Sequence, residues 1–307
     1  MREAIPTIRV RTRNGTLLAR DGVILCFFMR RSHEEVVPAV WRALQAYLRA
    51  IPPRAISWFH SASGEKLPFN EEGREYIRKK MLEPLQMDFC NVYLVGEDQG
   101  QISGFHFEYN GRRLDAPIYV QDKDSTCAVS FTFPTEYLVE NGPSHLRALS
   151  LELARELPFS FGYASGAFIS QGPIWQSMLY TLFDPLDRYL GMDVYYLNNT
   201  SRIIGTGARG AYWLTFLGQP LLGQLGGVER LRQELSFPEV SFQPLEGERL
   251  LIALGEWPDA IDTTQQPHVP HYRALARLLE PYLRDEDLGW GAVEQQKMNQ
   301  WLRRLCQ

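Results

Sequence analysis

An uninterrupted apolar run near the N-terminus constrains the fold of this chain most strongly. Residues 23–29 read VILCFFM and contain no charged side chain. A strand with one solvated face alternates between apolar and polar residues, so a run without alternation is typical of a strand that is buried on both faces. We therefore expect these residues to form a central strand of a sheet that is covered on both sides.

Helical and strand patterns alternate along the rest of the chain. Ser32 and Glu35 have the spacing of a capping box, and apolar residues at helical spacing continue to Leu48. The dipeptides Asn14-Gly15 and Asp21-Gly22 predict tight turns. Further strands are expected over residues 7–13, 17–20, 55–59, 89–95, 102–109, 127–133, 159–169, 240–243 and 249–254. Further helices are expected over residues 70–82, 143–157, 173–189, 211–225, 228–235, 272–283 and 295–305.

The order of these elements repeats along the chain. Residues 1–120 read as strand, helix, strand, helix and hairpin, and residues 121–307 repeat that order after a polar segment at 112–124. The pattern predicts an α+β fold with mixed or antiparallel sheets, packed helices and two halves of similar structure. The halves are either two domains, 1–120 and 121–307, or parts of one compact unit. The alternative interpretation is that any α+β chain can be divided in this way.

The composition of the chain indicates its cellular compartment and excludes some classes of binding partner. The formal net charge is −4, whereas general nucleic-acid binding needs an excess of lysine and arginine. The N-terminal residues lack the apolar segment of a secretory signal, and no apolar run is long enough to cross a membrane. The cysteines at 26, 90, 127 and 306 are scattered, without the spacing of a redox or metal motif. We expect a cytoplasmic protein that binds neither nucleic acid nor a membrane.

One glycine-rich stretch matches a cofactor-binding pattern. Gly205, Gly207 and Gly210 have the spacing G-x-G-x-x-G, which in a dinucleotide site follows a strand, opens a helix and precedes an acidic residue by about 20 positions. Glu229 lies near that distance but follows two glycines rather than a strand. A flexible turn that leads into an apolar helix is the favoured interpretation, and a nucleotide-binding enzyme is the alternative.

The other candidates for chemistry have ordinary structural explanations. His268 and His271 flank a proline, without a cysteine or acidic residue at ligand spacing, which favours a polar loop over a metal site. His33 and His145 each follow a serine at a helix start, where capping accounts for the pattern. Ser165 misses the nucleophile-elbow spacing by one position. The sequence predicts no catalytic residue, metal or cofactor, which favours a binding protein over an enzyme.

Acidic residues beside tryptophan mark the predicted contact surface. Acidic pairs occur in predicted loops, where the ordinary explanation is a solvated surface and the functional one is contact with a basic partner. Trp257 with Asp259 and Asp262 is the strongest combination, because tryptophan dominates interface hot spots. The predicted partner-binding residues are Glu97, Asp98, Trp257, Asp259, Asp262, Asp285, Asp287 and Trp290.

Several motifs in a fixed order resemble the type VI secretion immunity family of TsiV-like proteins. An isoleucine-glycine turn at 203–205 precedes the segment W-L-T-F-L-G at 213–218, and L-G-G follows at 225–227. Similar matches lie at 32–35 with the helix that follows, at 161–166 and at 272–277. Residues 256–264 read EWPDAIDTT where the family has a glycine-rich loop, so partner contacts there are expected to differ. The W-L-T-F-L-G segment is expected in the buried core.

The resemblance implies an immunity protein that acts in the bacterial cytoplasm. Its partner would be a cognate type VI effector, similar to nucleases of the restriction-endonuclease-like class, including VRR-type domains. Two mechanisms are open: an acidic loop occupies the basic DNA cleft, or the protein blocks assembly or motion of the toxin. The alternatives are the nucleotide-binding enzyme and a self-associating structural module. A homodimer is compatible with all three.

Overall fold

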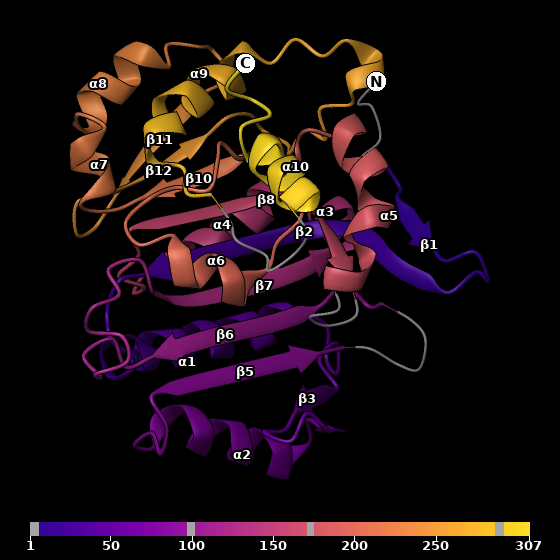
Figure 1. The fold of residues 1–307 in the computed structure, drawn as a ribbon, viewed down its shortest axis with the longest axis vertical. Helices are drawn as coiled ribbons and strands as arrows, with labels where there is room; N and C mark the ends of the chain where they lie inside the picture. Colours follow the sequence, from indigo (N-terminus) through magenta and orange to yellow (C-terminus); the bar gives the residue numbers. More distant parts are fainter. Residues whose placement is uncertain (1–5, 97–101, 171–174, 286–291) are drawn as a thin grey trace.

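A single continuous sheet forms the centre of the molecule (Figure 1). The computed structural model describes residues 6–96, 102–170, 175–285 and 292–307, without the side chains of 175–181 and 292–294. Within these residues twelve strands follow the order β11-β12-β10-β8-β2-β7-β6-β5-β3-β4, with β1 beside β2 and β9 beside β8. Neighbouring strands are antiparallel, except that β9 is parallel to β8.

The strands differ greatly in length, and the longest lie in the middle of the sheet. The strands are β1 (Arg9–Arg11), β2 (Leu17–Met29), β3 (Trp58–His60), β4 (Lys66–Pro68), β5 (Phe89–Val95), β6 (His106–Arg112), β7 (Cys127–Pro134), β8 (Phe161–Ser170), β9 (Met192–Asp193), β10 (Leu214–Leu217), β11 (Ser241–Leu245) and β12 (Arg249–Ala253). Long central strands with short strands at the edges leave little exposed backbone for unwanted pairing.

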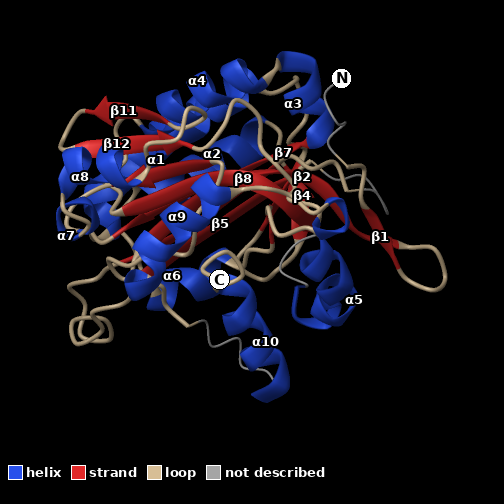
Figure 2. Cartoon of the chain, turned by 90° about the horizontal axis from the view of Figure 1, so that it is seen from above, coloured by secondary structure: helices blue, strands red, loops and turns tan. Residues whose placement is uncertain are grey.

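Helices cover the sheet on both sides (Figure 2). They are α1 (His33–Ala50), α2 (Glu71–Leu82), α3 (Thr135–Asn141), α4 (Pro143–Ala154), α5 (Trp175–Arg188), α6 (Leu197–Ile203), α7 (Leu221–Gln224), α8 (Gly227–Glu234), α9 (Pro270–Leu279) and α10 (Ala292–Leu302), with 3-10 helices at Thr263–Gln265 and Glu280–Tyr282. Buried residues of α1 to α4 belong to one core, and those of α5 to α10 belong to the other. The chain therefore has the predicted α+β class.

The strand β2 shows how the sequence produces the two cores. Alternate residues of a strand point to opposite faces. Ile24, Cys26 and Phe28 lie in the core beneath α5 to α10. Val23, Leu25, Phe27 and Met29 lie in the core beneath α1 to α4. The predicted central strand, buried on both faces, is confirmed.

The predicted tight turn at Asp21-Gly22 is wrong. The strand β2 continues through both residues, and Gly22 pairs with β7 on one side and with β8 on the other. A Cβ atom at Gly22 would lie 2.1 Å from Cδ1 of Ile169. The glycine is therefore explained by close packing between strands rather than by a turn.

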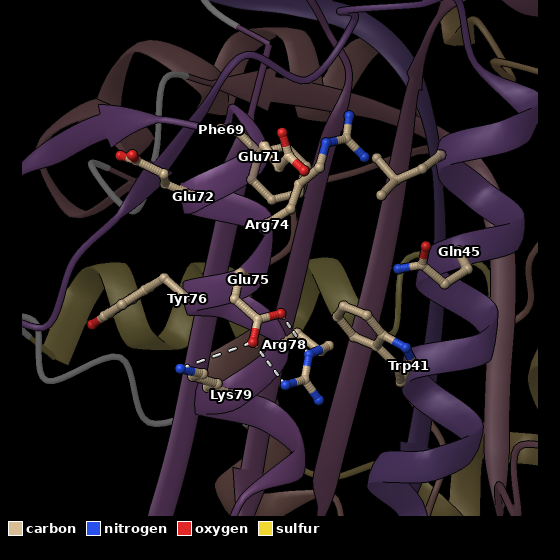
Figure 3. A pocket seen from close by; sticks show the side chains of 11 residues that line it. Trp41, Gln45, Phe69, Glu71, Glu72, Arg74, Glu75, Tyr76, Arg78 and Lys79 are labelled. Atoms are coloured by element: carbon tan, nitrogen blue, oxygen red, sulfur yellow. Dashed lines mark hydrogen bonds and ion pairs between the residues drawn. The ribbon is translucent and has the colours of Figure 1, made fainter.

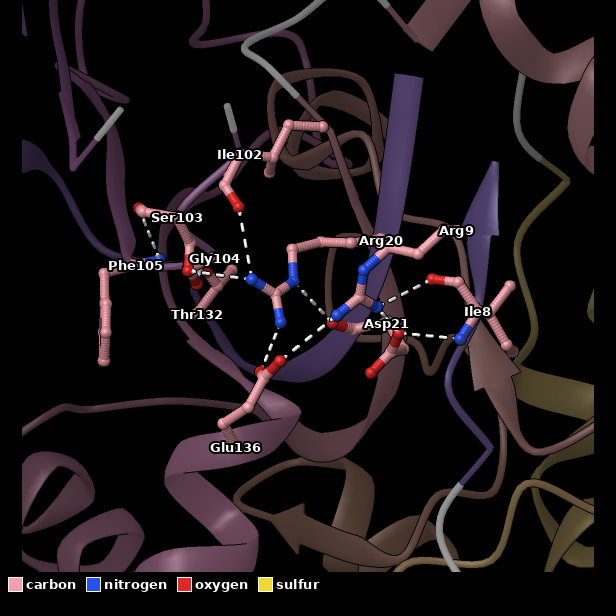
Figure 4. Close-up of polar contacts among 10 residues, drawn as sticks. All are labelled: Ile8, Arg9, Arg20, Asp21, Ile102, Ser103, Gly104, Phe105, Thr132 and Glu136. Atoms are coloured by element: carbon pink, nitrogen blue, oxygen red, sulfur yellow. Dashed lines mark hydrogen bonds and ion pairs between the residues drawn. The ribbon is translucent and has the colours of Figure 1, made fainter. Parts of the chain in front are cut away.

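The buried carboxylate of Asp21 finds its partners at and just before the start of β1 (Figure 4). The backbone N–H of Ile8 donates to its carboxylate at 2.8 Å, and Arg9 forms an ion pair with it. Arg9 and Arg20 both reach Glu136 on α3. This network joins β1, β2 and α3 at one end of the central strands.

The predicted helix over residues 211–225 is also wrong. Its first part forms β10, which pairs with β8 and β12, and only Leu221–Gln224 is helical. Trp213, Leu214 and Phe216 are 2% exposed or less, so the prediction that this segment is buried core is confirmed. Leu214 and Phe216 lie in one core and Leu217 in the other, so the sequence of β10 does not alternate between apolar and polar residues. A short apolar run of this kind fits a buried strand as well as a helix.

Strands from both sides of residue 120 lie in the same sheet. The first long strand, β2, is hydrogen-bonded to β7 and β8. The hairpin β5–β6 lies between β7 and β3, whereas the hairpin β11–β12 forms the opposite edge beside β10. The division into residues 1–120 and 121–307 stays a prediction.

The capping box of Ser32 and Glu35 at the start of α1 is confirmed.

Candidate functional site

The glycine-rich turn at 205–210 does not have the surroundings of a dinucleotide site. The helix α6 precedes it, and Ala208 forms a backbone bridge with Leu283 where a helix would have to open. A Cβ atom at Gly207 would lie 2.5 Å from the carbonyl oxygen of Tyr282. The glycines therefore allow close packing of backbone against backbone, and the space that a pyrophosphate needs is filled.

The same turn places an arginine inside the protein. Arg209 is 3% exposed and forms an ion pair with Asp193, which is 0% exposed. Its guanidinium also donates to the carbonyl oxygen of Val194 at 2.6 Å and to the hydroxyl of Tyr212 at 2.8 Å. The hydroxyl of Tyr163 donates to the other oxygen of Asp193 at 2.7 Å. This buried cluster holds β8, β9 and the segment before β10 together.

Arginine side chains also attach the C-terminal helix to this region. The guanidinium carbon of Arg304 lies 3.7 Å from the ring centroid of Trp301, and its Nε donates to the carbonyl oxygen of Leu190 at 2.6 Å. The guanidinium carbon of Arg209 lies 5.7 Å from the same ring. Sequence reasoning missed this cluster, because it considered the glycines of the motif and not the arginine between them.

The predicted acidic contact residues have different surroundings. Asp259 is exposed and accepts a hydrogen bond from the backbone N–H of Ile261 at 2.7 Å. Asp262 accepts from Arg188 at 2.8 Å, and this hydrogen bond holds the pKa of the carboxyl well below its usual value. Trp257 is half-buried and packs against the core beneath α1 to α4. A carboxylate that already binds an arginine gains less from a basic partner than a carboxylate without one.

The remaining predicted residues are either ion-paired or outside the described chain. Asp285 pairs with Arg303 at 2.6 Å. The other four lie outside the described residues: Glu97, Asp98, Asp287 and Trp290. Trp257, Asp259 and Asp262 thus lie in one segment with different partners, and Asp285 lies beside Arg303, which follows α10.

A first cleft lies between α1 and α2 (Figure 3). It has a volume of about 780 Å³, with Trp41 on one wall and Phe69 on another. Three charged groups of α2 at this cleft pair with one another: Glu75 binds Arg78 at 2.6 Å and Lys79 at 3.9 Å. Surface pairs of this kind contribute little free energy.

A second and larger groove lies on the sheet at β5 and β6. Its volume is about 1010 Å³, and its walls come from α2, the segment 83–87, the turn between β3 and β4, and the start of α6. Three apolar or aromatic side chains at this groove are strongly exposed: Tyr76 by 41%, Met87 by 60% and Phe89 by 40%. Side chains of these types are enriched in protein interfaces.

The groove also contains an acidic side chain with unusual electrostatics. Glu108 on β6 accepts a hydrogen bond from Nδ2 of Asn110 at 2.8 Å. Burial raises the pKa of its carboxyl to about 7, because neighbouring groups remove water that would stabilise the charge. Titratable groups with such shifts often belong to functional sites. Sequence reasoning missed Glu108, which stands in a strand rather than in a loop.

Comparison with known proteins identifies the family of the chain. The profile of TsiV, described as "Type VI immunity for VRR-NUC", matches residues 39–305. The chain belongs to this family. A solved structure described as "Pseudomonas aeruginosa T6SS protein PA0821" is similar in fold, with a TM-score of 0.80, 18% sequence identity, and coverage of 98% of this chain and 87% of that one. No curated protein matches the chain.

The resemblance to the type VI immunity family is therefore confirmed. Across the described residues, no group of three or more histidine, cysteine or acidic side chains has the arrangement of a metal site. The ring of His271 packs against Phe237 and Tyr272, as a structural histidine does. None of the helices in the described part of this TsiV-family chain is long and apolar enough to span a bilayer.

Proposed function

We propose that this TsiV-family chain neutralises a VRR-type nuclease effector by binding it directly, without catalysis. The family match over residues 39–305 carries the proposal. Direct binding is supported by the groove at β5 and β6, where Met87 and Phe89 are exposed beside the polar side chains of Glu108 and Asn110. An exposed apolar patch with a polar surround is typical of a protein-binding surface. The cytoplasm of the bacterium that makes the effector is the proposed place of action.

The test is co-expression with a VRR-type nuclease effector from the same genome, sought first in the adjacent reading frames. We expect cells to survive, and the two proteins to purify together as a complex that withstands gel filtration. Because the nuclease and its inhibitor are made in the same cell, binding should be tight enough for the complex to persist at nanomolar concentration, with an interface of about 1,600 Å² or more. If the nuclease kills cells that contain the folded chain, and no complex forms, direct neutralisation is wrong.

A DNA competition experiment separates the two possible modes of inhibition. If the chain covers the DNA cleft of the nuclease, increasing DNA should displace it, and added salt should weaken the competition. If the chain blocks assembly or motion of the nuclease, DNA and the chain should bind together. The same assay tests the predicted acidic segment: if this segment contacts the nuclease, Asp259→Asn and Asp262→Asn should weaken binding of the chain to the nuclease.

A further inference from the structure

The sheet face at β5 and β6 carries a row of side chains that line the second groove. Buried residues on these strands, such as Leu94 and Phe107, belong to the core beneath α1, which Figure 1 shows behind β6. Because side chains alternate, the residues between them face the other side of the sheet. Tyr93 stands directly opposite Glu108, and Asn91 stands opposite Asn110. All four line the groove.

Glu108 is an acid without a basic partner in the described structure. Its carboxylate accepts from Asn110, and within the described residues it forms no ion pair. Two lysines also line the groove: Lys79 pairs with Glu75 at 3.9 Å, and Lys80 lies near the other end of β5, where its carbonyl oxygen accepts from Cys90 at 3.4 Å. A cation that entered the groove beside Tyr93 would meet a carboxylate, an aromatic ring and amide oxygens.

The rim and the floor of the groove serve different purposes. Tyr76, Met87 and Phe89 form an exposed apolar rim that can exclude water from a bound chain. The floor around Glu108 and Asn110 is polar. Charged pairs that become desolvated inside such a ring contribute strongly to binding, whereas pairs at the rim contribute little.

We propose that this groove is the docking site of the nuclease effector, and that Glu108 binds an arginine or lysine side chain from the DNA-binding face of that nuclease. This inference rests on the proposed function. A nuclease must neutralise phosphates with clustered arginine and lysine, so its active face offers the complementary charge. An inhibitor that binds one of these side chains competes for a group that the nuclease needs for DNA.

The proposed contact makes binding depend on pH. Burial raises the pKa of Glu108 to about 7, and a bound cation favours the charged form, so affinity should rise as pH rises through 7. The other titratable or charged groups of the groove include Tyr93, His60, Lys79, Lys80 and Glu83, and His106 lies beside Tyr93. Cys26 and Tyr195 also interact electrostatically with Glu108. The Glu108→Gln variant distinguishes the pH dependence that Glu108 contributes from that of the other groups, because those groups stay in place when the carboxyl is removed.

The experiment measures the affinity of the purified chain for a catalytically inactivated VRR-type nuclease effector from the same genome, by calorimetry at pH 6 and pH 8. Wild type should bind about tenfold more tightly at pH 8. Glu108→Gln should weaken binding at pH 8 by about 30-fold and should flatten the pH profile. The matched control is Glu229→Gln on α8, where the side chain is 82% exposed, and it should bind like wild type. Met87→Ser removes an exposed rim residue and should weaken binding without unfolding the chain.

Each result decides between distinct conclusions. If folded Glu108→Gln binds the nuclease as wild type does, with the same pH profile, the docking site is wrong and the proposed function stands. If wild type itself does not bind the nuclease, the proposed function fails and this inference fails with it. If Glu108→Gln changes the sedimentation of the chain alone and leaves nuclease binding intact, the groove binds a second copy of the chain, and the proposal is overturned.

Discussion

Replacing Arg209 by methionine should be among the most destabilising single changes in this protein. The methionine keeps most of the aliphatic volume and removes the guanidinium. Asp193, which is 0% exposed, then loses its ion-pair partner, and the carbonyl oxygen of Val194 loses a donor at 2.6 Å. Tyr163 still donates to Asp193 at 2.7 Å, so part of the carboxylate stays hydrogen-bonded.

The expected cost follows from the state that the substitution leaves behind. Removing one partner of a buried ion pair costs about 3–5 kcal/mol, since the other charge stays buried without compensation. A domain is stable by only about 5–15 kcal/mol, so this loss should be plain in a urea unfolding curve at pH 7 followed by tryptophan fluorescence. The ring of Trp301 lies beside Arg209, and its signal should report loosening of α10.

A matched control uses an arginine that is paired at the surface. Arg188 binds Asp262 at 2.8 Å with its own side chain 49% exposed, so Arg188→Met should cost about 1 kcal/mol or less. The double variant Arg209→Met with Asp193→Asn should recover part of the loss, because the buried charge is removed. A cost below about 1 kcal/mol for Arg209→Met would refute this account of the cluster.

Three further predictions concern stability. Burial raises the pKa of Glu108 from 4.5 to about 7, so ionisation of this carboxyl lowers the stability of the folded chain as pH rises through that range. Urea unfolding should therefore show Glu108→Gln to be about 3 kcal/mol more stable than wild type at pH 8. The two proteins should be about equally stable at pH 4.5. Gly22→Ala should lower the melting temperature by several degrees, because its Cβ would lie 2.1 Å from Ile169. Burial lowers the pKa of His33 from 6.5, so wild type should lose stability as pH falls through 6.5, and His33→Gln should lose less.

The sequence predicts the parts of this fold that depend on local pattern. The run at residues 23–29 has no alternation and forms a strand between two cores. The capping box at Ser32 begins α1, because side chains within four residues decide that geometry. The polar composition of the segment between β6 and β7 likewise predicts the loop that is found there.

The errors occur where distant residues decide the local structure. The Asp21-Gly22 dipeptide has the composition of a turn, but β7 and β8 pair with it on both sides and hold it in the strand. The W-L-T-F-L-G segment is a strand because β8 and β12 pair with it. Its short apolar run does not distinguish a strand from a helix.

The candidate site was hidden from the sequence for a related reason. The charged and aromatic residues of the predicted loops could be recognised by composition alone. Glu108 stands in a strand, and its character depends on α6, α2 and β5, which are assembled around it from distant parts of the chain. Arg209 was likewise hidden, since its partner Asp193 lies in β9, a strand of two residues.

The position of β2 between β7 and β8 has a consequence for the timing of assembly. The ribosome completes β2 by residue 29, but its partners at 127–134 and 161–170 are made much later. At about 5–20 residues per second this strand waits on the order of ten seconds for its neighbours. The strands of the groove, β5 and β6, are also made before β7, the strand that joins them to β2. The nascent chain therefore carries the residues of its docking surface well before it can hold them in place.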